Sequence, residues 1–191
     1  MNLTKKLELE VVRKDPFYIR WVDNPSEEMQ LEAVIKNHIC YPYIHNPTEK
    51  VTLEAIRRCG LNIRHVEEPT QQMKMDAVRQ DGRAICYIKT PNIEIQRAAV
   101  RQSGKAIHHI QNPSEEIQLE SVFKDGLSIK YIENPSEEVQ LAAVRNNVFA
   151  LQYIKCPTEK VQFLIVKEGS KLLYKRIKNP TSGIQSMVEL K

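Results

Sequence analysis

A proline returns every 22 residues along this chain of 191 residues. It occurs as Pro25, Pro47, Pro69, Pro91, Pro113, Pro135 and Pro157, and Pro180 follows one residue late. Around each proline lies a variant of N-P-S-E-E-x-Q-L-x-A-V-x-x-x-G-x-x-I-x-x-I. A fixed period of this length is typical of arrays in which each small unit buries its apolar face only against its neighbours. We therefore expect the chain to fold as a solenoid.

The first part of each unit predicts a helix. We number the unit from its proline, which is position 1. Apolar residues recur with helical spacing at positions 5, 7, 9 and 10, as in Val139, Leu141, Ala143 and Val144. Asn or Thr precedes the proline in six units, and we expect it to cap this helix, with glutamate at position 3 completing a capping box. Glycine at position 14 predicts a left-handed residue that ends the helix, at Gly60, Gly82, Gly104 and Gly126.

The rest of the unit predicts a second, shorter helix. Apolar residues stand at positions 16 or 17 and at position 20, as in Ala106, Ile107 and Ile110. So few residues remain before the next unit that this helix is expected to be partly 3₁₀. Because less space is available on the inside of a curved array, the short helices should line its concave side.

These patterns predict one all-α domain over residues 1–191, a right-handed superhelical solenoid of about eight units. The expected units are 3–24, 25–46, 47–68, 69–90, 91–112, 113–134, 135–156 and 157–179, and a capping helix follows at 180–191. Terminal caps of this kind are what repeat arrays require.

Several functional classes find no support in the sequence. No window of about 20 apolar residues could cross a membrane, and the start lacks the apolar stretch of a signal peptide, so a cytoplasmic protein is expected. The four cysteines fall at four different positions of the unit, without C-x-x-C spacing, so we expect no metal site and no cofactor. Common catalytic motifs are absent as well, and the chain is not expected to be an enzyme.

The net charge of +4 is unevenly spread. Residues 69–112 carry seven Lys or Arg against three acids, and residues 155–191 carry eight against three. Two basic zones separated by an acidic one do not make the uniformly basic surface of a typical nucleic-acid-binding protein. The basic central units also depart most from the repeat consensus, so specificity for a partner could be encoded there.

Position 19 gathers most of the large polar rings of the chain. Its residues are Trp21, Tyr43, His65, Tyr87, His109, Tyr131, Tyr153 and Arg176, and position 18 beside it includes Arg64, His108 and Lys130. Amphipathic rings edged by cations suit a strip that binds a protein or stacks nucleic-acid bases. Regular packing of each ring on the next unit predicts the same ladder. The sequence leaves both interpretations open.

Two further ladders recur. A basic ridge comprises Arg57, Arg79, Arg101 and Arg145 at position 11, together with Arg83. Cations in the last turn of a helix complement its dipole, although a ridge that contacts phosphates would use the same residues. Position 6 is Gln in six units, and we expect its amide to bond the backbone of the next unit.

The run Asn-Pro-Ser-Glu-Glu, at 24–28, 112–116 and 134–138, resembles the leucine-rich repeat variant and HEAT-like families. The run from Ala99 to Ile110 also resembles DUF4116-type repeats of unknown function. These resemblances imply an interaction scaffold. The clustered cysteines that bind an iron–sulfur cluster in some leucine-rich repeat variant proteins are missing here.

The expected function is therefore non-catalytic recognition of a macromolecule through the concave strip around position 19. The first candidate for this partner is a protein. Binding of RNA or single-stranded DNA on the same strip is the alternative. A small phage-type inhibitor of a cellular enzyme is a further alternative. No membrane and no small-molecule substrate are expected as partners.

Overall fold

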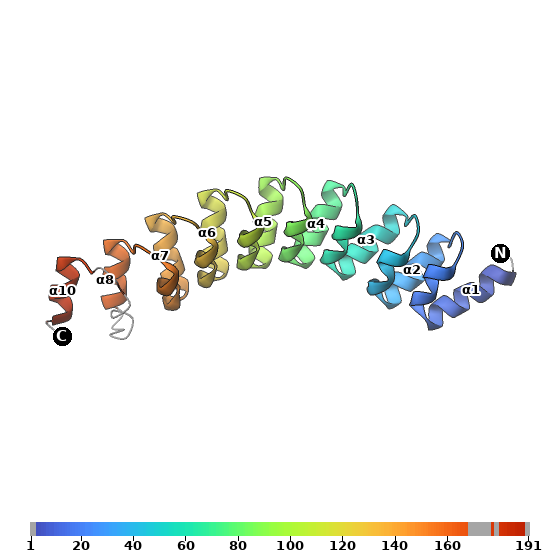
Figure 1. Ribbon diagram of the computed structural model, residues 1–191, viewed down its shortest axis with the longest axis horizontal. Coiled ribbons are helices and arrows are strands. Elements are labelled where there is room, and N and C mark those ends of the chain that lie inside the picture. The colour runs from blue at the N-terminus through green and yellow to red at the C-terminus, as the bar shows by residue number, and fades with distance from the viewer. Residues whose placement is uncertain (1–2, 168–176, 178–179, 190–191) are drawn as a thin grey trace. The chain divides into compact units, whose positions relative to one another are not determined.

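The structure is a computed structural model that describes residues 3–167, 177 and 180–189 (Figure 1). This part of the chain contains helices and no strand, as the repeat predicts. Seven times in succession, a long α-helix is followed by a 3₁₀ helix of six residues. The chain is thus an all-α helical-repeat solenoid. The second helix expected in the unit 157–179, together with Arg176, lies outside the described residues.

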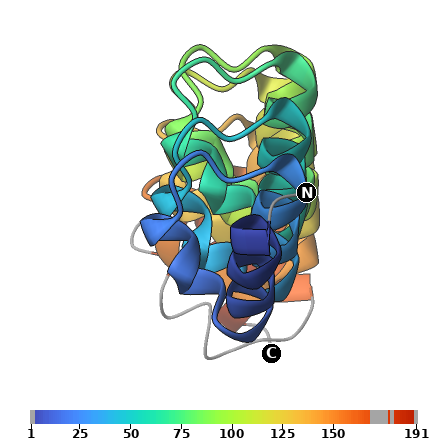
Figure 2. The ribbon, with the colours of Figure 1, turned by 90° about the vertical axis from the view of Figure 1, so that its right-hand side faces the viewer.

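Contacts divide the chain into two compact units, of which the first is Met1–Pro91. It contains α1 (Leu3–Lys14), η1 (Pro16–Trp21), α2 (Glu27–Lys36), η2 (His38–Tyr43), α3 (Glu49–Arg58), η3 (Gly60–His65), α4 (Gln71–Gln80) and η4 (Gly82–Tyr87). Within this unit α2 packs on α3 and α3 on α4, while each short helix packs on the next short helix. The long helices therefore form one row and the short helices another (Figure 2).

The second compact unit is Asn92–Lys191. It contains α5 (Ile93–Gln102), η5 (Gly104–His109), α6 (Glu115–Lys124), η6 (Gly126–Tyr131), α7 (Glu137–Asn146), η7 (Val148–Tyr153), α8 (Glu159–Lys167) and α10 (Ser182–Glu189). The same two rows recur from α5 to α8 and from η5 to η7. Helix α10 packs on α8, at the place where a terminal capping helix was expected.

The helix cap lies two residues later than the sequence interpretation placed it. Ser26, Thr48, Ser114 and the equivalent residues before α4, α5 and α7 are the N-caps at position 2, and each side chain accepts a hydrogen bond from the backbone N–H of position 5. The Asn before the proline instead adopts a left-handed conformation, with φ of 50° at Asn24 and 48° at Asn112. Asn tolerates positive φ better than most residues, so it makes the turn that leads into the helix. Proline therefore precedes the cap and does not occupy the first helical turn.

The prediction that glycine ends the long helix in a left-handed cap is also wrong. The helix ends at position 12, the capping residue at position 13 has an extended backbone, and glycine at position 14 begins the 3₁₀ helix. A Cβ built on Gly126 would lie 2.5 Å from the carbonyl oxygen of Ala143, and one on Gly104 would lie 2.6 Å from that of Ser121. Glycine is present because the short helix approaches the long helix of the next unit so closely.

The core follows the repeat with one change. Positions 5, 9 and 10 of the long helices and positions 17 and 20 of the short helices are almost all buried. Position 7, predicted to be buried, is only half-buried in residues such as Leu31 and Leu141. Its place in the core is taken by position 6, where Gln30, Gln140 and Gln162 are buried. A polar side chain can occupy that place because its amide is fully engaged there, as shown below.

The first helix differs from the later long helices. Leu3 and Leu7 on α1 are 71% and 60% exposed, and nothing in the described chain packs on that side. No helix among the described residues is both long and apolar enough to cross a membrane.

Candidate functional site

Position 17 of each short helix and the capping residue at position 20 point inward, whereas positions 18 and 19 between them point outward. A 3₁₀ helix has three residues per turn, so positions 17 and 20 lie on one face. Ile107 and Ile110 at these positions are 1% and 7% exposed, whereas His108 and His109 between them are exposed. The same alternation recurs in the other six short helices, which confirms the predicted direction of positions 18 and 19.

In each compact unit the rings at position 19 form a row, with Trp21, Tyr43, His65 and Tyr87 in the first unit and His109, Tyr131 and Tyr153 in the second. We call these two rows together the aromatic strip. Trp21 is 69% exposed, and Tyr43, Tyr87 and Tyr153 are 42–46% exposed. Both histidines are exposed as well, and only Tyr131 is half-buried. Inter-unit packing therefore leaves a large part of most rings open to solvent.

Some rings of the strip nevertheless touch a ring of the preceding repeat. The ring centroids of Phe17 and Tyr43 are 6.0 Å apart and those of Tyr41 and His65 are 6.4 Å apart, both in edge-on contacts. His108 and Tyr131 lie closer, with centroids 4.6 Å apart and the rings tilted by 41°. These rings are therefore partly packed on the preceding repeat and partly exposed.

Cations lie directly over two of these rings. The Arg20 guanidinium is 5.0 Å from the centre of the Trp21 ring, and the Lys130 ammonium is 4.6 Å from the centre of the Tyr131 ring. A cation above an aromatic face is attracted by the ring quadrupole. Its contact with Tyr131 raises the pKa of Lys130. These cations remain free to meet an acidic group of a partner, since neither forms an ion pair with a described carboxylate.

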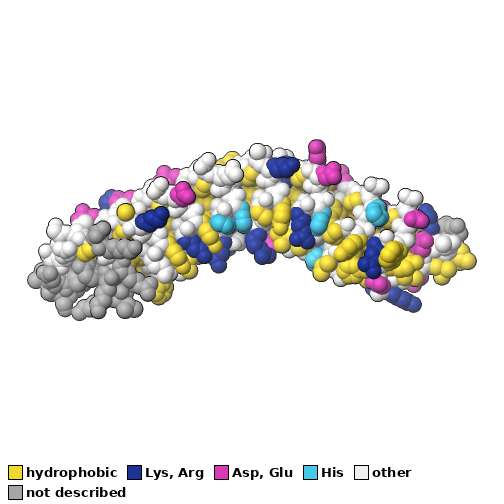
Figure 3. Space-filling view, in the orientation of Figure 1, with side chains coloured by type: hydrophobic (Ala, Val, Ile, Leu, Met, Phe, Trp, Pro, Cys, Tyr) yellow, Lys and Arg dark blue, Asp and Glu magenta, His cyan; other side chains and the backbone are white. Residues whose placement is uncertain are grey.

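The two histidines of the strip favour the neutral form. Partial burial, together with the neighbouring Arg64 cation, lowers the pKa of His65, whose Nε2 accepts a hydrogen bond of 2.8 Å from Arg64 Nε. Partial burial and the adjacent His108 likewise lower the pKa of His109. Because an unperturbed histidine titrates near pH 6.5, both rings are neutral at physiological pH. Figure 3 shows histidine, cationic and hydrophobic side chains interspersed over the face in view.

A hollow of about 820 Å³ opens along the strip in the second unit. Tyr131 and Tyr153 line it, with Lys130, Lys155 and His108 beside them. The remaining lining residues come from the loops that follow η6 and η7: Ile132, Glu133, Asn134, Pro135, Ile154 and Cys156, with Gln140 from α7. The hollow therefore joins aromatic faces, cations and loop backbone in one place.

The basic ridge on the long helices is arranged differently. Arg57 Nε lies 3.3 Å from a carboxylate oxygen of Asp76, and Arg101 Nε lies 2.6 Å from one of Glu120. Each pair joins position 11 of one unit to position 8 of the next, and Arg13 with Glu32 repeats the pattern at 3.4 Å. These pairs link consecutive repeats. The sequence reasoning missed them, although acids at position 8 recur 19 residues after an arginine at position 11.

The other members of the ridge lack such a partner. Arg79 and Arg145 are exposed and form no ion pair with any described residue, and the following units carry Ala98 and Leu164 at position 8. Arg83 pairs within its own unit, at 2.7 Å from Asp81, and this interaction lowers the pKa of Asp81. The ridge is therefore interrupted and partly neutralised.

Arg97 shows how a departure from the consensus can be structural. It occupies position 7, where other units carry an apolar residue, and its Nε lies 2.8 Å from Glu120 Oε1. Glu116 and Glu94 also pair with it. Arg97, Arg101 and Glu120 thus form one ion-pair network between α5 and α6. Arg97 and Arg101, two of the basic residues of the central units, therefore link neighbouring repeats.

The glutamine ladder joins repeats as predicted. Gln140 Nε2 donates to the carbonyl oxygen of Pro135 at 3.0 Å, and its Oε1 accepts from the backbone N–H of Thr158 at 3.1 Å. Gln30 and Gln162 make the equivalent pairs of bonds. The amide bonds its own unit and the next, which explains why a buried polar group is tolerated at position 6.

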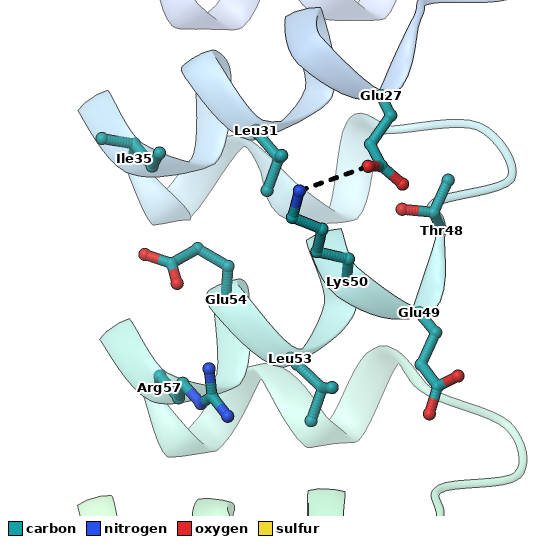
Figure 4. A pocket seen from close by; sticks show the side chains of 9 residues that line it. All are labelled: Glu27, Leu31, Ile35, Thr48, Glu49, Lys50, Leu53, Glu54 and Arg57. Carbon is teal, nitrogen blue, oxygen red and sulfur yellow. Dashed lines mark hydrogen bonds and ion pairs between the residues drawn. The ribbon is translucent and has the colours of Figure 1, made fainter.

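A second hollow, of about 660 Å³, lies between α2 and α3. Leu31, Ile35 and Leu53 supply its apolar wall (Figure 4). Lys50 Nζ lies 3.5 Å from Glu27 Oε1 across it. The cations here are satisfied within the chain, because Arg57 pairs with Asp76. This hollow therefore offers a partner less unpaired charge than the one on the strip.

No group of three or more His, Cys, Asp or Glu in the described part of the chain could hold a metal ion. Cys40 is buried, and burial raises the pKa of its thiol to about 11. Comparison of the chain with protein-family models, with curated proteins and with solved structures gave no match.

Proposed function

We propose that this chain is a non-catalytic binding scaffold that recognises another protein through the aromatic strip. One observation carries the proposal: the rings at position 19 stay 42–69% exposed in Trp21, Tyr43, Tyr87 and Tyr153, although positions 17 and 20 of the same repeats are buried. Rigid amphipathic rings lose little conformational entropy when they bind, and they are enriched among the residues that dominate protein interfaces.

The ion pairs of the arginines on the long helices favour a protein over a nucleic acid as the partner. A surface that binds phosphates needs cations that are free to replace counterions. On the long helices Arg57, Arg97 and Arg101 are already paired with carboxylates of the chain. Arg79 and Arg145 form no ion pair with a described residue, but the paired Arg101 and the apolar Phe123 stand between them in the series of position-11 residues. Beside the rings Arg20 and Lys130 form no ion pair with a described carboxylate, and such separate cations suit a local acidic contact better than a continuous phosphate backbone.

The test is capture of partners from a cell lysate by the tagged chain, with and without nuclease. We expect a protein to be captured in both cases, and to be lost when Trp21, Tyr87 and Tyr153 are changed together to alanine. The matched control removes three exposed rings outside the strip, Phe123, Phe149 and Phe163, which are 64%, 54% and 45% exposed. Capture that requires intact nucleic acid, or that fails equally in both variants, would contradict the proposal.

A further inference from the structure

The hollow between η6 and η7, of about 820 Å³, is large enough for several residues of an extended segment. Packed helices lie about 8–10 Å apart, and η6 and η7 pack against each other within the second unit. Tyr131 and Tyr153 occupy the same position of these two helices and both line the hollow. Their rings are therefore offset by about one repeat, and we call the space between two such rings a slot.

That spacing matches one conformation of an extended peptide. A polyproline II helix has three residues per turn and rises about 3.1 Å per residue, so residues i and i+3 present the same face about 9 Å apart. A segment in this conformation could place every third residue in successive slots between position-19 rings. A regular β-strand repeats its face about every 7 Å and would lose register with the repeats after one step.

The charge around the hollow indicates what else the segment carries. Lys130, Lys155 and His108 line it, against a single acid, Glu133. Neither lysine forms an ion pair with a described carboxylate, and Lys130 is held over the Tyr131 ring. A segment with acidic residues between its apolar ones would therefore meet complementary charge on both sides of the slot.

We propose that the strip in the second unit, at Tyr131 and Tyr153, binds a polyproline II segment of a partner protein that has an apolar residue at every third position and acidic residues between them. This inference rests on the proposed function and specifies its partner. Aromatic-lined grooves bind such preformed segments well because little entropy is lost on binding.

The probe is a library of random dodecapeptides, selected for binding to the full chain. The expected enriched peptides carry proline or aliphatic residues at i, i+3 and i+6, together with Asp or Glu. Enrichment of amphipathic helical patterns, enrichment of basic peptides, or no enrichment at all would overturn the inference. A single-stranded RNA dodecamer serves as a competitor, and displacement of the peptides at lower concentration by the RNA would overturn it too.

Variants then locate the site of the best selected peptide by fluorescence anisotropy. Tyr153→Ala should weaken binding by about tenfold or more, as expected for a central aromatic anchor, while Tyr153→Phe should retain most of the affinity. Phe149→Ala is the matched control, because Phe149 is a more exposed ring of the same short helix outside the hollow. Equal losses in Tyr153→Ala and Phe149→Ala would contradict the placement.

The charge contribution is tested in the same assay. Changing Lys130 and Lys155 to glutamine should weaken binding severalfold and reduce its dependence on salt, whereas Lys124→Gln on α6 should do neither. If a lysate protein is captured through the rings but the selected peptides lack the period of three, the inference fails and the proposed function stands. If the ring variants lose no partner at all, both fail.

Discussion

On the long helices Arg57 and Arg101 reach carboxylates of the next unit, whereas on the short helices Arg20 and Lys130 lie over aromatic rings of their own unit. Both rows repeat with the same period, and both looked like candidate binding surfaces in the sequence. The difference is where the complementary group lies. Arg57 and Arg101 find their acids inside the chain, whereas Arg79 and Arg145 of the same row form no ion pair with a described residue. The short-helix row leaves rings and cations exposed. A recurrent charged or aromatic position is a candidate binding surface only where its side chains are not already paired within the chain.

The largest loss of stability is expected where the two rows meet. In Gly126→Ala the new methyl group would lie 2.5 Å from the Ala143 carbonyl oxygen, on the next long helix. Overpacking of this kind costs about 1–3 kcal/mol, measured as the free energy of unfolding in urea. The control is Gly183→Ala in α10, where the nearest atom is 3.8 Å from the built Cβ. That variant should be stabilised by up to about 1 kcal/mol, because alanine favours a helix. Equal behaviour of the two variants would show that the rows do not meet so closely.

The next effect concerns glutamines at two positions of one repeat. Gln140→Leu leaves the Pro135 carbonyl and the Thr158 N–H without their hydrogen bonds, at a cost of about 1–3 kcal/mol. Gln152→Leu changes an exposed residue at position 18 and should leave the free energy of unfolding almost unchanged. Urea titration of both variants measures the contrast. A larger loss at Gln152 would show that the strip side contributes more to stability than the buried amide.

The smallest effect separates paired from unpaired arginines on the long helices. Arg101→Gln breaks the ion pair with Glu120 and should cost at most about 1 kcal/mol, less at high salt. Arg79→Gln removes a charge at the same position that has no ion pair in the described structure, and the expected change in free energy is near zero. Thermal unfolding at two salt concentrations measures the difference. If Arg79 proved as important as Arg101, the pairing rule between positions 11 and 8 would be wrong.

Much of the fold could be predicted from the period alone. The two helices per unit, the buried positions 17 and 20, and the exposed positions 18 and 19 all follow from apolar spacing. The glutamine ladder could be predicted because a recurrent amide among apolar neighbours needs backbone partners. The helix cap was misplaced because Asn before proline is a good cap in general, while Ser26 and its equivalents at position 2 cap the helices from α2 to α7.

Other features depended on contacts between repeats, which no local pattern encodes. Gly126 fits a helix end in sequence, and only the approach of Ala143 from the next unit shows its actual role. The pairing of Arg101 with Glu120 spans 19 residues, so it is invisible within a single unit. For the candidate site, the sequence named the rings of the strip, but their partial exposure depends on how far the preceding repeat covers them.

The most direct test of the central claim measures stability and partner capture on one variant, with Trp21, Tyr87 and Tyr153 changed to alanine. None of the three contacts another aromatic ring in the described structure, and each is at least 42% exposed. We predict that capture is lost while the melting temperature falls by less than about 5 °C, since surface substitutions change the free energy of unfolding little. A much larger fall in melting temperature, or unchanged capture, would show that the strip holds the repeats together and does not bind a partner.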